Sequence, residues 1–316
     1  MRNLNTRTNN MTICTMDLKA QYQSTLKEQV VPQFKQEGFT IKSINCYTRE
    51  VDGMLQKFSV YGRVAKGSDC KSFTFELSLY ASNTDTYDIS PTFYCRFGHI
   101  QRGRDHWYYL YHDNYEQLSE LVALDIRQFA IPFFNGIKKT DDIYQLIALR
   151  EKVPLSLLPL ALKERFPGMG RDYEKEFLHV WKQIMRPLAV AAGFREIENV
   201  FYRFPNNVVV QAFYLQCWMT NTKTFMNLEG MLSFFVKSPE QVEIPPLNQP
   251  SSGWIHISSA YVITGKSSLY NRYTLSDYTP EQMHRLVTDD WNAFILPFFE
   301  RLKVPEVVEA ISSAGR

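Results

Sequence analysis

The residues most able to do chemistry lie together between Cys95 and Asp113, the densest polar and aromatic stretch of the chain. This stretch carries histidine, arginine, aspartate, tryptophan and tyrosine side chains in close succession. Tryptophan, tyrosine and arginine dominate binding at protein interfaces, and they also stack on and neutralise nucleic acids. The stretch is therefore a candidate recognition surface, for which we single out seven residues: His99, Arg102, Arg104, Asp105, His106, Trp107 and Tyr109.

Three other interpretations of this stretch stay open. In a nuclease-like site, His106 would act as the base while Arg102 and Arg104 hold a phosphate. A metal site would need ligands at a regular spacing, which the stretch does not have. In an ordinary hairpin, the arginines would be solvated, Trp107 and Tyr109 would pack on the helices, and His99 would be a core or edge group.

No catalytic motif is found elsewhere in the chain. The sequence lacks a phosphate-binding loop, a dinucleotide-binding glycine motif, a nucleophile elbow and a zinc-protease helix. The five cysteines are odd in number and form no C-x-x-C pair, which favours reduced thiols over a disulfide framework or a zinc site. We expect a non-enzymatic protein that uses no metal and no cofactor.

Composition narrows the class of protein further. The 316 residues are 45% hydrophobic and 22% charged, as in folded globular proteins. Lys and Arg (35) nearly balance Asp and Glu (33), so no global field draws the chain to DNA or to an anionic membrane. The first residues lack the apolar core of a secretory signal, and the longest apolar run, Val153–Leu162, is far shorter than the roughly 20 residues that cross a bilayer. We expect a cytoplasmic protein.

The sequence is similar to itself. At a shift of 165, residues 114–147 match residues 279–312 at ten of 34 positions. Nearer the start of each half, a shift of 155 pairs Gly38-Phe39 with Gly193-Phe194 and Gln56 with Gln211. The difference of ten residues indicates an insertion, which we place in the loop Lys237–Gly253 because its prolines and serines are typical of irregular structure. Its segment Ile244–Pro250 could dock in a partner's groove or be a simple insertion.

Periodicity predicts the elements of each half. Apolar residues at three- and four-residue spacing predict a helix over 18–36, ended near Gly38, and alternating residues then predict antiparallel strands. Thr279-Pro280-Glu281-Gln282 has the layout of a capping box, with Asn114 and Gln117 at the matching positions. We expect Pro132 and Pro297 to end or kink their helices.

These elements predict an α+β fold of two degenerate tandem repeats. Each repeat would contain a helix, an antiparallel meander of four or five strands, and a closing helix pair packed on one face of the sheet. The predicted boundaries are a polar tail over residues 1–16, a first repeat over 17–150, a linking helix and loop over 151–171, and a second repeat over 172–316.

Comparison of the two halves separates residues that the fold needs from residues that it does not. In the second half, Tyr261–Tyr270 takes the place of the candidate surface and lacks its His, Arg, Asp and Trp residues. The fold therefore does not require these side chains. Asp125 and Asp290 are shared, and we expect a surface ion pair or a hydrogen bond to a chain end, with a functional carboxylate as the alternative.

Several short motifs resemble one known family. Gly38-Phe39 after the first helix, Leu55-Gln56 with Phe58, Arg96-Phe97-Gly98-His99 and Gly103-Arg104-Asp105-His106-Trp107 resemble domain of unknown function 4304. The resemblance covers residues 18–147 and, more faintly, 173–312. It implies a bacterial, cytoplasmic, non-catalytic domain, of a kind that sometimes serves as an immunity protein against a cognate toxin.

Three hypotheses follow. The first is a protein-binding module, in particular an immunity protein that covers a toxin's active site. The second is a nucleic-acid-binding or phosphodiester-processing enzyme that uses residues 102–106. The third is a structural module that self-associates.

Overall fold

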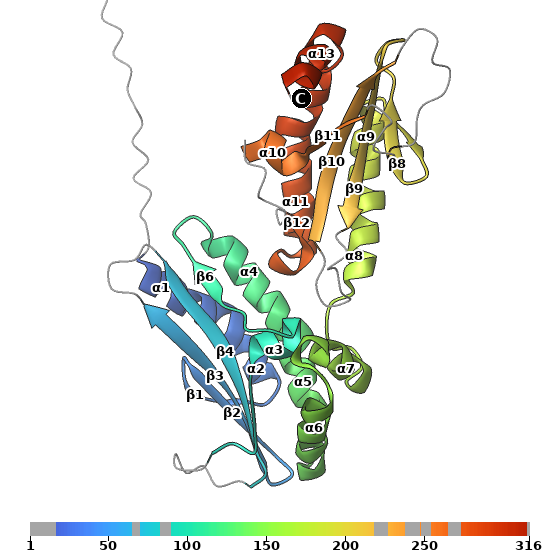
Figure 1. Ribbon diagram of the computed structural model, residues 1–316. Coiled ribbons are helices and arrows are strands. Elements are labelled where there is room, and N and C mark those ends of the chain that lie inside the picture. Colours follow the sequence, from blue (N-terminus) through green and yellow to red (C-terminus); the bar gives the residue numbers. More distant parts are fainter. Residues whose placement is uncertain are drawn as a thin grey trace, which may run out of the picture. The chain divides into compact units, whose positions relative to one another are not determined.

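In the computed structural model, the chain divides into two compact units, residues 1–169 and 170–316, and each is described by itself (Figure 1). The structure describes residues 17–64, 70–82, 90–217, 227–237, 247, 254–264 and 273–314. The predicted polar tail and most of the predicted insertion loop lie outside these residues.

The first unit is an α+β domain with one antiparallel sheet, in the order β1-β2-β3-β4-β5, and with β6 also paired to β4. Its strands are β1 (Thr40–Ser43), β2 (Cys46–Val51), β3 (Met54–Val64), β4 (Lys71–Tyr80), β5 (Phe93–Arg96) and β6 (Tyr108–Leu110). Its helices are α1 (Leu18–Thr25), α2 (Val31–Gln36), α3 (Phe97–Arg102), α4 (Tyr115–Asp125), α5 (Ile131–Gly136), α6 (Thr140–Lys152) and α7 (Leu158–Arg165).

The second unit has the same order of elements and its own antiparallel sheet, β11-β10-β9-β8-β7, with β12 paired to β10. Its strands are β7 (Arg195–Ile197), β8 (Val200–Arg203), β9 (Val209–Cys217), β10 (Asn227–Val236), β11 (Ile255–Ser258) and β12 (Tyr273–Thr274). Its helices are α8 (Tyr173–His179), α9 (Arg186–Ala191), α10 (Ser259–Thr264), α11 (Pro280–Asp290), α12 (Leu296–Arg301) and α13 (Pro305–Ala314).

The α+β class with antiparallel sheets is confirmed, but the described part of each sheet has six strands where the sequence predicts four or five. The additional strands are β6, with three residues, and β12, with two. Strands this short have too few residues to show an alternating pattern.

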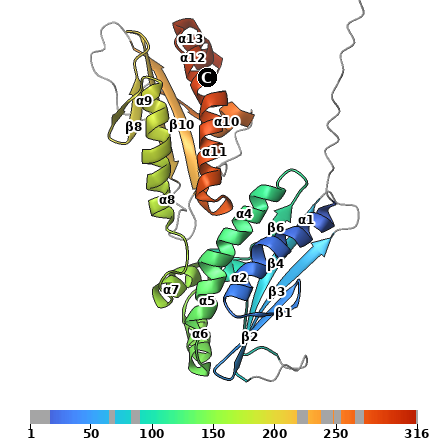
Figure 2. The ribbon, with the colours of Figure 1, turned by 180° about the vertical axis from the view of Figure 1, so that it is seen from behind.

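Helices cover one face of the first sheet and leave the other face open. Figure 1 shows the sheet with α1, α2, α4 and α5 on one side. Figure 2 shows the molecule from behind, with these helices in front of the sheet. Across the strands, the row Tyr47, Phe58, Leu77 and Cys95 is buried in the core under these helices. The adjacent row, one residue along each strand, therefore points to the open face.

Four helical segments continue through a proline, and two of these prolines, Pro132 and Pro297, were expected to end or kink their helices. In each case, a π-helical turn directly precedes the proline-containing helix, as in Ile126–Ala130 before Pro132 and Trp291–Ile295 before Pro297. The same arrangement precedes Pro32 and Pro187. The expectation that Pro132 and Pro297 end their helices is wrong, because the wider turn accommodates a residue that has no amide donor.

The start of α11 confirms the predicted capping box. The Thr279 hydroxyl accepts from the Gln282 amide, and the Gln282 side chain accepts from the Thr279 amide. At the matching position of the first unit, the Asn114 side chain makes no cap hydrogen bond to α4. It bonds instead to the backbone at Tyr109 and Tyr111.

An arginine–glutamine pair ties the sheet to the helices in each unit. The buried Gln56 donates to the carbonyls of Phe134 (3.1 Å) and Ile137 (2.8 Å) and accepts twice from Arg49 (3.0 and 2.8 Å). The pair therefore joins strand β2, strand β3 and the end of α5.

The second unit repeats this arrangement with fewer bonds. Gln211 donates to the carbonyl of Phe299 (2.7 Å) and accepts once from Arg203 (2.8 Å). Arg203 also reaches the carbonyl of Ala192 (3.0 Å) at the end of α9.

Strand registers locate the ten-residue difference between the halves. Leu77 and Leu232 are 155 residues apart, whereas their partners Cys95 and Ile257 are 162 apart. Tyr108 and Tyr273, which pair with the same two long strands, are 165 apart. Seven of the ten residues therefore fall in the predicted loop Lys237–Gly253, and the other three lie between α10 and β12.

The segment predicted to link the halves packs into the first unit. Leu158, Leu162 and Phe166 are buried in the core of that unit. The ring of Phe166 lies 5.9 Å from that of Phe133 in an edge-to-face contact, and α7 packs against α3.

Candidate functional site

The candidate stretch forms an excursion from the sheet. Strand β4 pairs with β5 over Glu76–Leu79 and with β6 over Lys71–Phe73. The intervening residues 97–107 leave the sheet as helix α3 and a loop. The buried Thr74 hydroxyl donates to the carbonyl of His106 at 2.8 Å, which fixes the loop to β4.

Two glycines shape this excursion. A Cβ on Gly98 would lie 2.5 Å from the carbonyl oxygen of Arg104 and would also collide with the amide of His106. The loop therefore crosses α3 at a point where only glycine fits. Gly103 ends α3 with φ +69° in the left-handed region, and its Cα approaches the backbone of Ser156.

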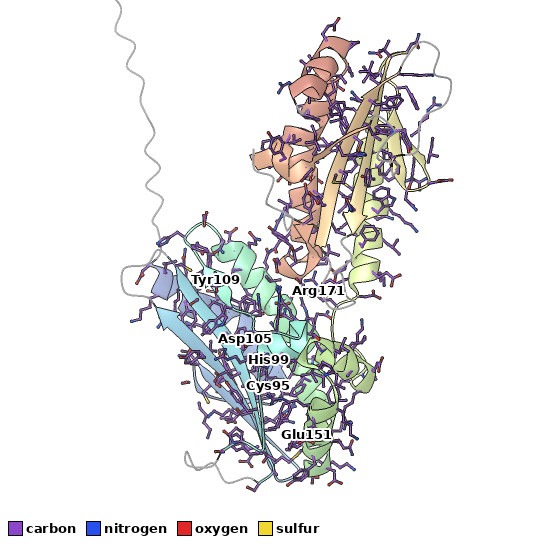
Figure 3. The ribbon with its side chains drawn as sticks, viewed as in Figure 1. Cys95, His99, Asp105, Tyr109, Glu151 and Arg171 are labelled. Carbon is purple, nitrogen blue, oxygen red and sulfur yellow. The ribbon has the colours of Figure 1, made fainter. Side chains whose placement is uncertain are left out.

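Asp105 is held between two basic side chains. One carboxylate oxygen pairs with Arg96 at the end of β5, and the other lies 3.1 Å from Nε2 of His99 on α3. Burial lowers the pKa of His99, and the neighbouring Asp105 only partly opposes this effect. Figure 3 shows Cys95, His99 and Asp105 gathered where β5 passes into α3.

Aromatic side chains surround this ion pair on the open face of the sheet. The Arg96 guanidinium lies 5.8 Å from the ring centre of Trp107, which contacts Tyr61 edge-to-face at 5.9 Å. The Tyr94 hydroxyl donates to Glu76 at 2.7 Å. Tyr61 and Tyr94 remain 41% and 39% exposed.

We name this cluster the Trp107 surface and define it by the residues that share these contacts: Tyr61, Glu76, Tyr94, Arg96, Asp105 and Trp107. Strand register accounts for its assembly, because Arg96 lies opposite Glu76, and Tyr61 opposite Thr74, on the open face. Three strands and one loop thus contribute to it.

Four of the seven predicted residues lie in or beside this surface. Asp105 and Trp107 belong to it, and His99 supports it through Asp105. Tyr109 is 51% exposed and lies opposite Ser72 on the same face. Arg104 is exposed on the loop that follows α3.

The other two predicted residues, Arg102 and His106, are turned more toward the interior. Arg102 is 8% exposed at the end of α3. The His106 ring packs edge-to-face on Tyr108 at 4.7 Å, and burial lowers its pKa well below the usual value. The structure therefore removes Arg102 from an exposed surface, whereas His106 stays half-buried beside Trp107.

Sequence analysis missed Tyr61, Glu76, Tyr94 and Arg96 as site residues. Each occupies an outward position in an alternating strand, and this pattern is the one signal that could have found them. The alternation does not show which strands are neighbours, so it could not bring the four residues together.

The shared aspartates are internal. Asp125 is fully buried and accepts from the Tyr108 hydroxyl at 2.7 Å, while Asp290 accepts from the Tyr273 hydroxyl at 2.8 Å. The expected surface ion pair is therefore replaced by a buried hydrogen bond between the closing helix and the short edge strand. Burial and the nearby Asp125 raise the pKa of Tyr108 well above its usual value.

The open face of the second sheet has a different composition. Its counterparts of Tyr94 and Arg96, by strand register, are His256 and Ser258, and Met231 stands in place of Glu76. His256 Nδ1 is 2.7 Å from the Ser233 hydroxyl. Farther along this face, apolar residues form a separate small cluster: Val210, Ala212, Phe235 and Trp254, with Val200, Tyr202 and Leu247 packed against them.

The described residues hold no group of three or more His, Cys, Asp or Glu side chains that could bind a metal ion. Of the cysteines with described side chains, Cys46, Cys70 and Cys95 are not joined in disulfides. In the same part of the chain, no helix combines the length and the apolar character that crossing a bilayer would require.

Fold and site together define a two-unit α+β protein with one aromatic, charge-paired surface on the open sheet face of its first unit. The family model described as "Domain of unknown function (DUF4304)" matches residues 30–136, which lie within that unit and include all six residues of the Trp107 surface. This match supports the resemblance to the family for that part of the chain. Comparisons with curated proteins and with solved structures find no match.

Proposed function

We propose that this protein is a non-catalytic binding module whose first unit recognises another protein through the Trp107 surface. The observation that carries the proposal is the cluster of the exposed Tyr61 with the half-buried Trp107 and Arg96, in which Arg96 is paired with Asp105. Side chains of these types supply most binding energy at interfaces. Because their contacts are made before any partner arrives, less ordering free energy opposes binding.

The proposal extends to the organisation of the chain and its setting. The two units are degenerate copies of one fold, of which only the first carries the surface. In its specific form, the protein is a bacterial cytoplasmic immunity protein that neutralises a toxin by covering it, as the family resemblance suggests.

Affinity capture of the tagged full chain from its native cells tests this proposal. The expected result is one stoichiometric protein that co-purifies with the wild type and with Tyr144→Ala, but not with Tyr61→Ala/Trp107→Ala. Tyr144 is a matched control because it is an exposed tyrosine (55%, against 41% for Tyr61) on α6 of the same unit. The double variant should raise the measured Kd at least about 30-fold. This is the effect of losing an interface hot spot of about 2 kcal/mol.

Three results would overturn the proposal. They are recovery of nucleic acid in place of a protein, retention of the partner by the double variant, and phosphodiesterase activity of the wild type that His106→Ala abolishes. Circular dichroism of each variant verifies that its fold survives. Concentration-dependent self-association without another partner would favour the structural module instead.

A further inference from the structure

We infer that the Trp107 surface is pH-sensitive, because protonation of His106 opens the loop of residues 103–107 and takes the surface apart. This inference rests on the proposed function and names the regulation of that site. It follows from where the His106 ring lies, which charges act on it, and which side chains flank it.

The His106 side chain is packed against the body of the first unit. Its ring contacts Tyr108 edge-to-face at 4.7 Å, and a Cβ on Gly98 of α3 would lie 2.8 Å from the Cβ of His106. The Nε2 atom of the ring is buried and has no hydrogen-bond partner among the described residues. A protonated histidine carries N–H groups on both ring nitrogens. Protonation in this place therefore leaves a buried donor and a positive charge without an acceptor.

The electrostatic surroundings of the ring oppose its protonation. Of the charged side chains that the structure describes, Arg102 at the end of α3 and Arg104 in the loop act on the ring, and both are cations. Burial lowers the pKa of His106 well below its usual value, and the two arginines lower it further. When the loop opens, water reaches the ring and restores its ordinary affinity for a proton. Acid therefore favours the open loop over the closed one.

The acidic side chains on the neighbouring elements have other partners. Asp125 on α4 accepts from the Tyr108 hydroxyl at 2.7 Å. Asp105 in the loop is shared by Arg96 and His99. A protonated ring would have to take one of these acids from its present partner. His99 differs in this respect, because Asp105 already lies 3.1 Å from its Nε2 and accepts from it once it is protonated.

The side chains that flank His106 belong to the Trp107 surface. Asp105 pairs with Arg96, and Trp107 contacts both Arg96 and Tyr61. These two residues are the members of the surface that the loop contributes. Opening of the loop breaks their contacts together, so the surface is formed only while His106 is neutral.

The second half shows that the fold does not need a histidine at this position. Tyr273 pairs with its long strand as Tyr108 does with β4, and it donates to Asp290. Two positions before Tyr273, the sequence has Asn271, where the first half has His106. His106→Asn is therefore a conservative variant that removes the titrating group.

Hydrogen exchange of the free full chain, measured by mass spectrometry at about pH 7.5 and about pH 5.5, tests the inference. Peptides that span residues 103–110 should exchange ahead of peptides from β3 at both pH values, because the loop opens locally. After correction for the intrinsic exchange rate, the opening equilibrium constant should be about tenfold larger at the lower pH. This is the ratio for a histidine that titrates at about 6.5 in the open loop and stays neutral in the closed one.

Two variants of His106 and one control separate this histidine from its neighbour. His106→Asn should lose the increase, and so should His106→Phe, which keeps an aromatic ring beside Tyr108. His99→Gln should keep the tenfold ratio, because Asp105 provides an acceptor for a protonated His99.

Three results would overturn the inference: an unchanged opening constant, an increase that both His106 variants retain, and exchange of the loop only together with β3, which would mean that the whole unit unfolds. The free chain has no partner in this experiment, so these results leave the proposed function standing. A partner that Tyr61→Ala/Trp107→Ala retains at about pH 7.5 would instead overturn the proposed function and leave the measured opening of the loop in place.

Discussion

Gln56 and Gln211 allow a quantitative test of how the helices are held on the sheets. Both glutamines are fully buried, yet Gln56 makes four side-chain hydrogen bonds where Gln211 makes two. Leucine has nearly the same size, so Gln56→Leu and Gln211→Leu remove the bonds without opening a large cavity. At about 1 kcal/mol per bond, the expected losses of stability are about 4 and about 2 kcal/mol.

Hydrogen exchange measured by mass spectrometry is the appropriate assay, because its peptides report on each unit separately. The slowest amides of the mutated unit should exchange about 1000-fold faster in Gln56→Leu and about 30-fold faster in Gln211→Leu, since each 1.4 kcal/mol is a factor of ten. The other unit should change little, because contacts cluster within units.

Equal effects of the two substitutions, or a larger effect of Gln211→Leu, would refute this reasoning. Such a result would show that the arginine–glutamine pair stabilises each unit through packing around Phe134 and Phe299, and not through the number of its hydrogen bonds. Arg49→Leu is the complementary variant, because it leaves the two bonds from Gln56 to the helix-end carbonyls in place.

Three further predictions concern the excursion and its surroundings. Gly98→Ala should lower the free energy of unfolding by about 2 to 3 kcal/mol, because its Cβ would collide with backbone atoms. Gly62→Ala is the control and should be tolerated, because its Cβ would meet only ordinary contacts. Thermal melts of the two variants compare these effects. Burial lowers the pKa values of His99 and His106, so the unfolded chain binds protons first as pH falls below about 6.5. Urea titrations should therefore show a stability that is complete above this pH and declines below it; a flat or opposite profile would contradict this. Burial raises the pKa of Cys95 to about 12, so mass spectrometry should find alkylation at about pH 8 slower there than at the half-buried Cys46.

Local patterns were enough to predict most elements of the fold. The helix over 18–36, the alternating strands and the Thr279 capping box depend on residues close together in sequence, so their periods and caps are visible there. The short strands β6 and β12 were missed because their pairing with β4 and β10 is a tertiary property. The prolines were misjudged because a π-helical turn depends on the packing of the whole helix.

The candidate site was predictable only in part, for a related reason. Residue type identified Asp105 and Trp107 as surface residues. The position of His106 depends on the bond from Thr74 to its carbonyl and on the crossing at Gly98, which join residues that are distant in sequence. Tyr61 joined the site because of its contact with Trp107, 46 positions farther along the chain.

The pattern of similarity between the units helps to separate folding from function. The features that the units share, namely the arginine–glutamine pair, the buried tyrosine–aspartate pair and the π-helical turns, all lie inside each unit and join its helices to its sheet. Their retention is explained by stability alone. The open faces differ, since one carries exposed rings around an ion pair and the other an apolar cluster that includes Leu247. Stability requires neither composition, so a function confined to one unit is best sought where the two units differ, which is the Trp107 surface.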